Sequence, residues 1–378
     1  MKFSLAAPLL AAAVMAACSA EPSTPESSSK SLLEILKDER IDRHIGIKPA
    51  SATPDGAFTV YKFDPSSPAR CVEGTPFYVS VRKGTSKNVM LYLQGGGACW
   101  DYDSCYVNSM AQTESSPLGD SRSKSGVFRA DNPANPMADW NVVYASYCDA
   151  SVWSGDADIA YMPTEKDQLA RYPKGRTTYH HGLANLSAAV TIVKDQFKDA
   201  PKIVVTGSSA GGYGTLMGFM VVRSQFPTTP LYVINDAGPW LMNPDNHAMT
   251  DHALKNWGVE HFYPPGCAKC REQMYYIADW AMARDPLSRW ALFSYDEDFT
   301  VGTLYLQYGG RYTDILFSET DYLHAQHAAQ FNGYFLHGPV HTILWSAAYD
   351  TAEKDGVKLT TWISDMVTDS QDWKDLRH

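Results

Sequence analysis

Continuous apolar runs alternate along the chain with segments rich in glycine, serine and proline. The runs that we assign to strands lie at 58–63, 77–82, 88–94, 141–147, 202–206, 231–234, 290–295 and 334–336. Several of them, such as Lys202–Thr206, lack alternating polar positions, which is typical of strands covered on both faces. The pattern therefore predicts a sheet that lies between two other layers.

Helical periodicity appears between these runs. Apolar residues at 183, 186, 190, 193 and 197 recur with the spacing of one helix face, and a proline at 201 ends the repeat. Residues 215–226 are apolar nearly all round, which indicates a buried helix, and a short amphipathic helix is expected from Ser31. Strands alternating with helices predict an α/β fold, a three-layer sandwich around a mostly parallel central sheet with helices on both faces.

The longer irregular segments bear on domain organisation. Residues 111–138 are rich in Ser, Asp, Asn and Pro and are expected to form a loop, whereas 242–289 is interpreted as an inserted cap or helical excursion. We find no internal repeat and no second domain boundary. Residues 31–378 are therefore predicted to form a single domain, long enough to bury a large core.

The first residues have the features of an export signal. Lys2 precedes an apolar stretch from Leu5 to Ala17 that is too short to span a bilayer. Met15-Ala16-Ala17-Cys18 resembles a bacterial lipobox, so residues 1–18 are interpreted as a lipoprotein signal peptide with Cys18 lipidated. Residues 19–30 are then a polar, disordered tether, and the protein is expected in the bacterial cell envelope, anchored in the periplasm or at the outer surface. Ordinary cleavage to a secreted protein is the alternative.

Charge and cysteine content narrow the class of protein. The net charge is −10 and no Lys/Arg-rich run occurs, so the chain lacks the electrostatic footprint of nucleic-acid binding. Besides the one at 18 there are six cysteines, an even number that indicates disulfides in an exported protein. Proximity in sequence favours the pairs Cys99–Cys105, Cys267–Cys270 and Cys71–Cys148. A zinc site at the second pair would need a further ligand pair with zinc-like spacing, which we do not find, and no metal or organic cofactor is expected.

A candidate nucleophile lies between a predicted strand and a predicted helix. Gly207-Ser208-Ser209-Ala210-Gly211 fits the pattern G-x-S-x-G, and it directly follows the apolar strand at 202–206. In an α/β hydrolase this sharp turn exposes the nucleophile at the helix N-terminus, where the helix dipole favours negative charge. Ser209 is therefore the expected nucleophile. The competing interpretation is a glycine-rich turn without catalysis.

Glycines at the end of an earlier strand are candidates for stabilising an oxyanion. Gly95-Gly96-Gly97 follows the run at 88–94, and successive glycines allow backbone N–H groups to point at an oxyanion without interference from a Cβ atom. The partner N–H group is expected from Ala210, the residue after the nucleophile.

A serine nucleophile needs a base and an orienting acid, which follow it in that fold in the order Ser, Asp/Glu, His. The strand at 290–295 delivers Asp296 and Asp298, and we favour Asp298 because apolar residues resume directly after it. Asp296 stays open as the alternative acid. His341 follows the last strand and is expected to open a helix, whereas His337 belongs to the strand end. Asp236 also ends a strand, and we interpret it as a structural hydrogen-bonding residue that lines the site.

These motifs together resemble the pectin acetylesterase/Notum family of serine carboxylesterases. The resemblance covers about 71–345 and rests on LQGGGAC at 93–99, YCD at 147–149, GSSAGG at 207–212, Asp236-Ala-Gly, and the late Asp and His. It implies a triad of Ser209, the late Asp and His341, with Gly96, Gly97 and Ala210 as the oxyanion hole.

The sequence thus predicts an exported serine carboxylesterase that forms an acyl-enzyme. Its favoured substrate is an O-acetyl group on a polysaccharide, and the partners expected are an acylated carbohydrate or other ester and the membrane that holds the lipid anchor. One alternative is an esterase for longer acyl chains, either lipase-like or protein-deacylating. The other is a catalytically inactive, glycan-binding surface lipoprotein.

Overall fold

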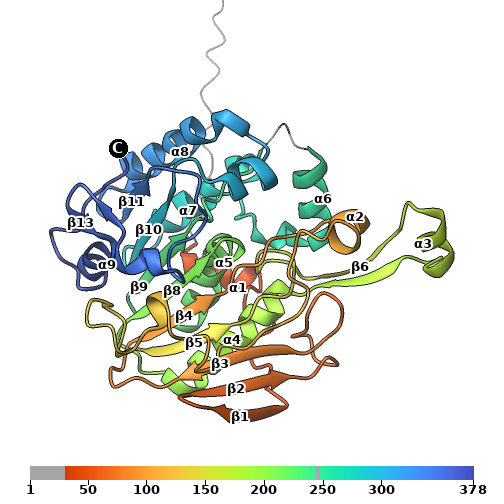
Figure 1. Cartoon of the computed structure of the whole chain (residues 1–378), viewed down its shortest axis with the longest axis horizontal. Coiled ribbons are helices and arrows are strands. Elements are labelled where there is room, and N and C mark those ends of the chain that lie inside the picture. The colour runs from red at the N-terminus through yellow and green to blue at the C-terminus, as the bar shows by residue number, and fades with distance from the viewer. Residues whose placement is uncertain (1–29, 244, 246) are drawn as a thin grey trace, which may run out of the picture.

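The computed structural model describes residues 30–243, 245 and 247–378, and it is built around one large sheet (Figure 1). The expected signal peptide, Cys18 and nearly all of the tether lie outside the described residues. The main sheet has nine strands in the order β1-β2-β3-β5-β4-β8-β9-β10-β11. Their bounds are β1 Ser51–Asp55, β2 Phe58–Phe63, β3 Phe77–Arg82, β4 Val89–Leu93, β5 Asn141–Ala145, β8 Ile203–Ser208, β9 Leu231–Asp236, β10 Ser288–Tyr295 and β11 Phe331–Leu336.

The six strands from β5 to β11 in this order run parallel, and β1, β2 and β3 form an antiparallel edge. Because parallel strands end at one edge of the sheet, the segments that follow β4, β5, β8, β9, β10 and β11 all start there. This edge is where an open α/β sheet binds its ligands.

Helices cover the sheet unevenly. Their bounds are α1 Leu32–Asp38, α2 Tyr102–Tyr106, α3 Lys166–Arg171, α4 Gly182–Phe197, α5 Ala210–Gln225, α6 His247–Trp257, α7 Tyr275–Met282, α8 Tyr312–His327 and α9 Leu359–Val367. One face packs against α1, α4, α5, α7 and α8, and the other packs against α9 and the irregular segments near 118–140 and 343–352. The predicted three-layer α/β fold is confirmed, although the second outer layer is irregular over much of its area.

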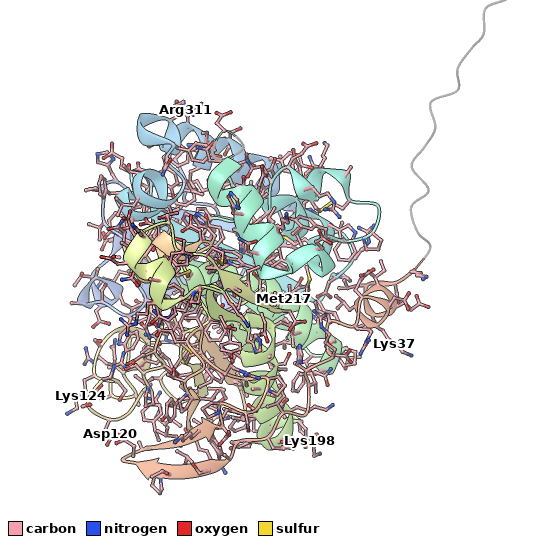
Figure 2. The ribbon with its side chains drawn as sticks, turned by 90° about the vertical axis from the view of Figure 1, so that its right-hand side faces the viewer. Lys37, Asp120, Lys124, Lys198, Met217 and Arg311 are labelled. Atoms are coloured by element: carbon pink, nitrogen blue, oxygen red, sulfur yellow. A yellow bond between two sulfur atoms is a disulfide. The ribbon has the colours of Figure 1, made fainter. Side chains whose placement is uncertain are left out.

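The sheet separates two apolar cores, as the pleat requires. Along β4, Leu91 and Leu93 point into the core beneath α4 and α5, whereas Met90 and Tyr92 point into the core beneath α9. Figure 2 shows Met217 of α5 inside the molecule, while Lys37, Lys198 and Arg311 lie at its outside. The continuous apolar runs of the sequence therefore arise because both faces of the strands are buried.

Smaller elements complete the chain. β6 (Ala157–Tyr161) and β7 (Arg176–His180) form an antiparallel hairpin that carries α3 and projects from the body (Figure 1). β12 (Glu353–Lys354) pairs with β13 (Val357–Lys358). Among the described residues, no helix has the length and apolar character that crossing a membrane requires.

The cysteine prediction is confirmed. The structure pairs Cys71 with Cys148, Cys99 with Cys105, and Cys267 with Cys270. The first bond joins the segment before β3 to the loop after β5, and the second closes the loop between β4 and α2.

One local prediction is wrong. His341 does not open a helix but lies in an irregular segment after β11, and the next helical turn is the short 3-10 helix Ala347–Asp350. The physical reason is local: Thr342, the next residue, has a positive φ of 63°, which no α-helix accommodates.

Candidate active site

Ser209 occupies a sharp turn between β8 and α5. Its φ of 58° and ψ of −122° lie in a region that costs a non-glycine residue free energy, and such strain concentrates at functional sites. The turn is fixed by two backbone hydrogen bonds, from the Ser209 N–H to the Asp236 carbonyl (2.8 Å) and from the Tyr213 N–H to the Ser209 carbonyl (3.0 Å). The side chain is half-buried and lines a cavity of about 360 Å³ that His341 also lines. The strained turn thus presents the hydroxyl to an open space.

His341 is oriented by Asp298. Its Nδ1 lies 2.6 Å from Asp298 Oδ2, and the carboxylate is 1% exposed. The other carboxylate oxygen accepts the Val301 N–H at 3.0 Å. A carboxylate that accepts a hydrogen bond at Nδ1 selects the tautomer of a neutral imidazole in which Nδ1 carries the proton and Nε2 keeps its lone pair.

Nε2 of His341 is buried and has no hydrogen-bond partner among the described residues. The structure therefore brings Ser209 and His341 to one cavity without a hydrogen bond between Oγ and Nε2. Such contacts are often long in ligand-free sites and tighten when substrate binds. An unpartnered basic nitrogen at the cavity that Ser209 lines is an arrangement that suits a general base.

The alternative acid belongs to a different pair. Asp296 contacts Nδ1 of His337 at 3.3 Å and accepts the Gly338 N–H at 3.1 Å. The His337 side chain is 81% exposed, so it neither packs nor lines the cavity with Ser209. The two acids two residues apart therefore bond to two different histidines, and only Asp298 bonds to His341.

The glycines after β4 lie against Ser209. A Cβ atom placed on Gly95 would stand 2.9 Å from Ser209 Cβ, and Gly96 and Gly97 line the same cavity. Within the described part of the chain, the N–H groups of Gly96, Gly97 and Ala210 donate to no protein acceptor. These three groups are free to bind an oxygen that develops negative charge.

Gly97 cannot be replaced without moving the loop. Its φ is 75°, and a Cβ atom there would lie 2.0 Å from the Met110 carbonyl oxygen. The loop continues into Cys99, whose disulfide to Cys105 and whose carbonyl, accepting from Trp257 Nε1 at 2.9 Å, hold it in place. The loop is therefore rigid, as preorganised donors must be.

An apolar cavity opens on the other side of Ser209. Its volume is about 90 Å³, and it adjoins a second apolar cavity of about 50 Å³ deeper in the protein. Its walls come from the glycine loop, α5, α6 of the 242–289 segment and the turn after Asp298. The apolar residues in these walls include Ala98, Trp100, Val152, Leu241, Met242, Ala253, Leu254, Trp257, Met274, Val301 and Leu306. A cap at 242–289 is predicted from the sequence, whereas the lining of this cavity by α6 is seen only in the structure.

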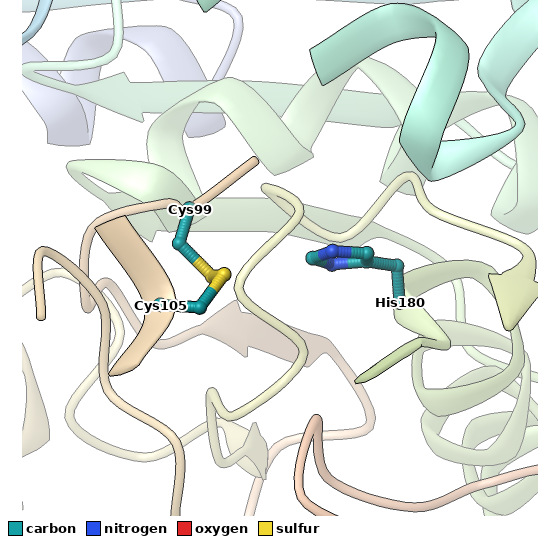
Figure 3. A group of neighbouring side chains, drawn as sticks. All are labelled: Cys99, Cys105 and His180. Atoms are coloured by element: carbon teal, nitrogen blue, oxygen red, sulfur yellow. A yellow bond between two sulfur atoms is a disulfide. The ribbon is translucent and has the colours of Figure 1, made fainter. Parts of the chain in front are cut away.

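Figure 3 shows a group whose residue types suit a metal ion: Cys99, Cys105 and His180, with candidate ligand atoms all within 4.8 Å of one another. Both sulfur atoms are used in a disulfide. Both ring nitrogens of His180 are also engaged, Nδ1 with the Asp149 carbonyl at 3.1 Å and Nε2 with the Tyr161 hydroxyl at 2.9 Å. Burial lowers the pKa of His180 to about 3, so the ring is neutral, and no free lone pair faces the sulfurs.

Two further carboxylates are fully buried near the site. Asp149, after β5, accepts from the N–H and hydroxyl of Ser151 and from the Trp153 N–H. Asp236, at the end of β9, accepts from the Ser208 hydroxyl and from backbone N–H groups near His341. Burial raises the pKa of each to about 6 although these hydrogen bonds act in the opposite direction. Asp236 was interpreted from the sequence as a structural hydrogen-bonding residue, and these bonds agree with that interpretation. Its bonds to the loop that carries His341 could not be predicted from the sequence.

Comparison with known proteins identifies the relatives of this chain. The sequence model of the pectinacetylesterase family matches residues 51–261, more than half of the chain. Pectin acetylesterase 4 of Arabidopsis thaliana is 26% identical over 180 residues, which are 46% of this chain and 42% of that protein. Palmitoleoyl-protein carboxylesterase NOTUM of Schmidtea mediterranea is 30% identical over 169 residues, which are 42% of this chain and 29% of that protein. The matches thus span less than half the length of these relatives.

A solved structure extends the likeness over the fold. The Wnt deacylase Notum from Drosophila superposes with a TM-score of 0.60, covering 87% of this chain and 95% of that one, at 15% sequence identity. At that identity the likeness concerns the fold alone. The family resemblance of the motifs is nevertheless confirmed by the match over 51–261. The chain belongs to the pectinacetylesterase family.

Proposed function

We propose that this protein is a serine carboxylesterase that hydrolyses a carboxylic ester through an acyl-enzyme on Ser209. The observation that carries the proposal is the meeting of three features at one edge of the sheet. These are the strained Ser209 turn, the Asp298-oriented imidazole with its unpartnered Nε2, and the free N–H groups of the glycine loop. The relatives' names, acetylesterase and carboxylesterase, agree with this chemistry.

Each step of the reaction has a residue to perform it. The Ser209 hydroxyl attacks the ester carbonyl carbon while His341 Nε2 takes the hydroxyl proton, and Asp298 stabilises the imidazolium. The negative charge on the carbonyl oxygen is held by the N–H groups of Gly96, Gly97 and Ala210. The imidazolium then protonates the leaving alkoxide, which leaves an acyl-enzyme. Water, deprotonated by Nε2, hydrolyses this ester, and the serine regains its proton.

The nucleophile assignment is tested by steady-state hydrolysis of p-nitrophenyl acetate. We expect Ser209→Ala to lower kcat by on the order of 10⁴-fold or more, because the variant lacks the hydroxyl that would carry the acyl group. Ala170→Leu, on the exposed α3, serves as the matched control and should keep wild-type activity. Turnover that survives in Ser209→Ala would remove this residue from the mechanism. A wild type without any turnover would favour the inactive, glycan-binding alternative.

For the substrate, we propose an O-acetyl group on a polysaccharide. The support is the family match and the open cavity of about 360 Å³ on the side of Ser209 that His341 lines, which leaves room for a bulky alcohol. Trp345 and Tyr305 also line this side, and flat aromatic rings suit the apolar faces of sugars.

One observation favours a second candidate, an ester of a longer acyl chain. The apolar cavities beside Ser209 and beneath α6 are larger than the space that one acetyl methyl group fills. Burying a methyl group needs only a few apolar contacts, and the walls of these cavities offer more than that. Each additional buried CH₂ would stabilise a bound acyl chain by about 0.8 kcal/mol.

A chain-length series separates the two candidates. The measurement is kcat/KM for p-nitrophenyl acetate, butyrate and octanoate, in wild type and in Ala253→Leu, which fills the cavity from α6. For a long-acyl enzyme, octanoate should exceed acetate by about tenfold or more, and Ala253→Leu should lower the octanoate value alone. For an acetylesterase, acetate should be the best of the three substrates. Released acetate from acetylated polysaccharides would then identify the alcohol.

We also propose that the protein is exported, which the three disulfides support because such bonds persist in oxidising compartments. Anchoring through a lipid on Cys18 remains a proposal from the sequence. The mass of the mature N-terminal peptide would reveal a lipidated cysteine or, against the proposal, an unmodified end.

A further inference from the structure

We infer that Asp236 is a positioning residue of this site, which fixes the loop that carries His341 against the turn that carries Ser209. The inference rests on the proposed function, since it assigns Asp236 a part in aligning base and nucleophile. Asp236 touches neither a substrate nor the reacting atoms, so its role would be exerted through its neighbours.

On the nucleophile side, Asp236 bonds to both residues of the turn. β8 and β9 are in register with Ser208 opposite Asp236. The Ser208 hydroxyl lies 2.5 Å from Asp236 Oδ2, and the Ser209 N–H donates to the Asp236 carbonyl at 2.8 Å. The side chain and the backbone of one residue therefore hold the two serines of the turn.

The direction of these bonds can be worked out from proton counts. Ser208 has one hydroxyl proton, and an ionised Asp236 can only accept it. The hydroxyl of Tyr92, 2.8 Å from Ser208 Oγ, must then donate to Ser208. A chain of donors thus runs from Tyr92 on β4 through Ser208 to Asp236, across three neighbouring strands.

On the histidine side, the carboxylate receives the backbone directly after His341. The Ile343 N–H lies 2.9 Å and 3.1 Å from the two carboxylate oxygens, and the Leu344 N–H lies 3.0 Å from Oδ2. Thr342, between these residues and His341, has a φ of 63°, which a threonine adopts only where its surroundings impose it. Asp236 supplies that constraint from the sheet, and the Val127 N–H bonds to the Leu344 carbonyl from the opposite side at 2.8 Å.

Burying the Asp236 carboxylate in order to hold a loop costs free energy. Asp236 is 0% exposed, and a charge so far from water is tolerated only when donors converge on it. The titratable groups that face it are Tyr92 on β4, Tyr295 on β10 and His341. Burial raises the pKa of Asp236 to about 6. Protonation below that pH would remove one acceptor from the junction of the two loops.

Two variants and one control test the inference. Asp236→Asn places an amide NH₂ against groups that are themselves donors, and Ser208→Ala removes one bond while sparing the carboxylate. Asp285→Asn is the control, because Asp285 is also buried (5% exposed) but pairs with Arg223 at the opposite end of β10. All three can lower thermal stability, so the deciding readouts are kcat, KM, the pH profile and amide exchange.

We expect kcat for p-nitrophenyl acetate to fall on the order of 10- to 100-fold in Asp236→Asn, since small misplacements of catalytic groups cost that much. In Ser208→Ala the expected loss is about fivefold, as for one hydrogen bond. KM should stay within about twofold, and Asp285→Asn should keep wild-type kcat. As the pH is lowered, kcat of the wild type should fall because the base is protonated. An additional fall, centred near pH 6, should come from protonation of Asp236, and Asp236→Asn should lack it.

Amide exchange separates the failure of this inference from the failure of the proposed function. The Ile343 and Leu344 amides should exchange about tenfold faster in Asp236→Asn but not in Asp285→Asn, because only the first loses its acceptor. Wild-type exchange at these amides, or wild-type kcat in a folded Asp236→Asn or Ser208→Ala variant, would overturn the inference. If Asp236→Asn does not fold, the kcat of Ser208→Ala alone decides whether the inference holds. A wild type without Ser209-dependent turnover would instead overturn the proposed function.

Discussion

At the scale of single residues, backbone strain marks the site. Ser209 follows β8, Ala237 follows β9, Val152 lies in the loop after β5, and Thr342 follows β11, and each has a positive φ. Non-glycine residues adopt such conformations only where the surroundings over-determine them. The segments that follow four parallel strands thus contain strained residues, and Ser209 and His341 lie in two of these segments.

The two late acids give a residue-scale prediction. Asp298→Asn should lower kcat by on the order of 10³- to 10⁴-fold, because an amide can donate to Nδ1 and so favour the tautomer whose Nε2 carries the proton. Asp296→Asn is the matched control two residues away, and it should keep kcat near the wild-type value because its partner His337 is exposed. Steady-state kinetics on p-nitrophenyl acetate compares them. A large loss in Asp296→Asn with little change in Asp298→Asn would reverse the assignment.

Only some site residues could be predicted from the sequence. Ser209, Ala210 and the glycines lie in local motifs whose chemistry is legible without a structure. The choice between Asp296 and Asp298 was open, because it depends on which side chain turns towards His341, 43 residues later. The bond from Ile343 to Asp236 joins residues 107 positions apart, and no local pattern encodes it.

At the scale of elements, every strand of the main sheet except β1 was predicted from the sequence. β4, β5, β8 and β9 are buried along their whole length, so their apolar runs stand out. β1 is fully exposed and its sequence, SATPD, carries no strand signal. Its pairing with β2 comes from tertiary structure, which overrides local preference.

Among the helices, α1 and α4 were predicted from the spacing of their apolar residues, and α5 was predicted because it is apolar nearly all round. α9 was left unassigned, although Leu359, Trp362, Ile363 and Met366 form a stripe with helical spacing that covers the second face of the sheet. A helix was expected to begin at His341, but the positive φ of Thr342 prevents it.

At the scale of the whole molecule, buried ionisable groups make stability depend on pH. The pKa of His180 is lowered from 6.5 to about 3 by burial, so the unfolded chain binds a proton that the folded chain refuses. The stability that His180 contributes is present above pH 6.5 and is lost as the pH falls below it. Asp149 and Asp236 act in the opposite direction, because their folded pKa of about 6 lies above the ordinary value of 3.8.

The contribution of His180 to this pH dependence can be measured by comparing the wild type with His180→Gln. Between pH 7 and pH 5, wild type should lose about 2 kcal/mol of unfolding free energy through His180, which His180→Gln should not lose. The measurement is urea denaturation of both proteins at both pH values with the disulfides intact. An identical pH dependence in the two proteins would mean that the folded chain protonates this imidazole as readily as the unfolded chain does.

We propose above all that Ser209 carries the acyl group during turnover. The most direct test is to react the protein with a fluorophosphonate and to locate the adduct by peptide mass spectrometry. We expect one adduct, on Ser209 within the GSSAGG turn, and none in Ser209→Ala. An adduct on Ser208 or on another residue, or labelling that persists in Ser209→Ala, would contradict it.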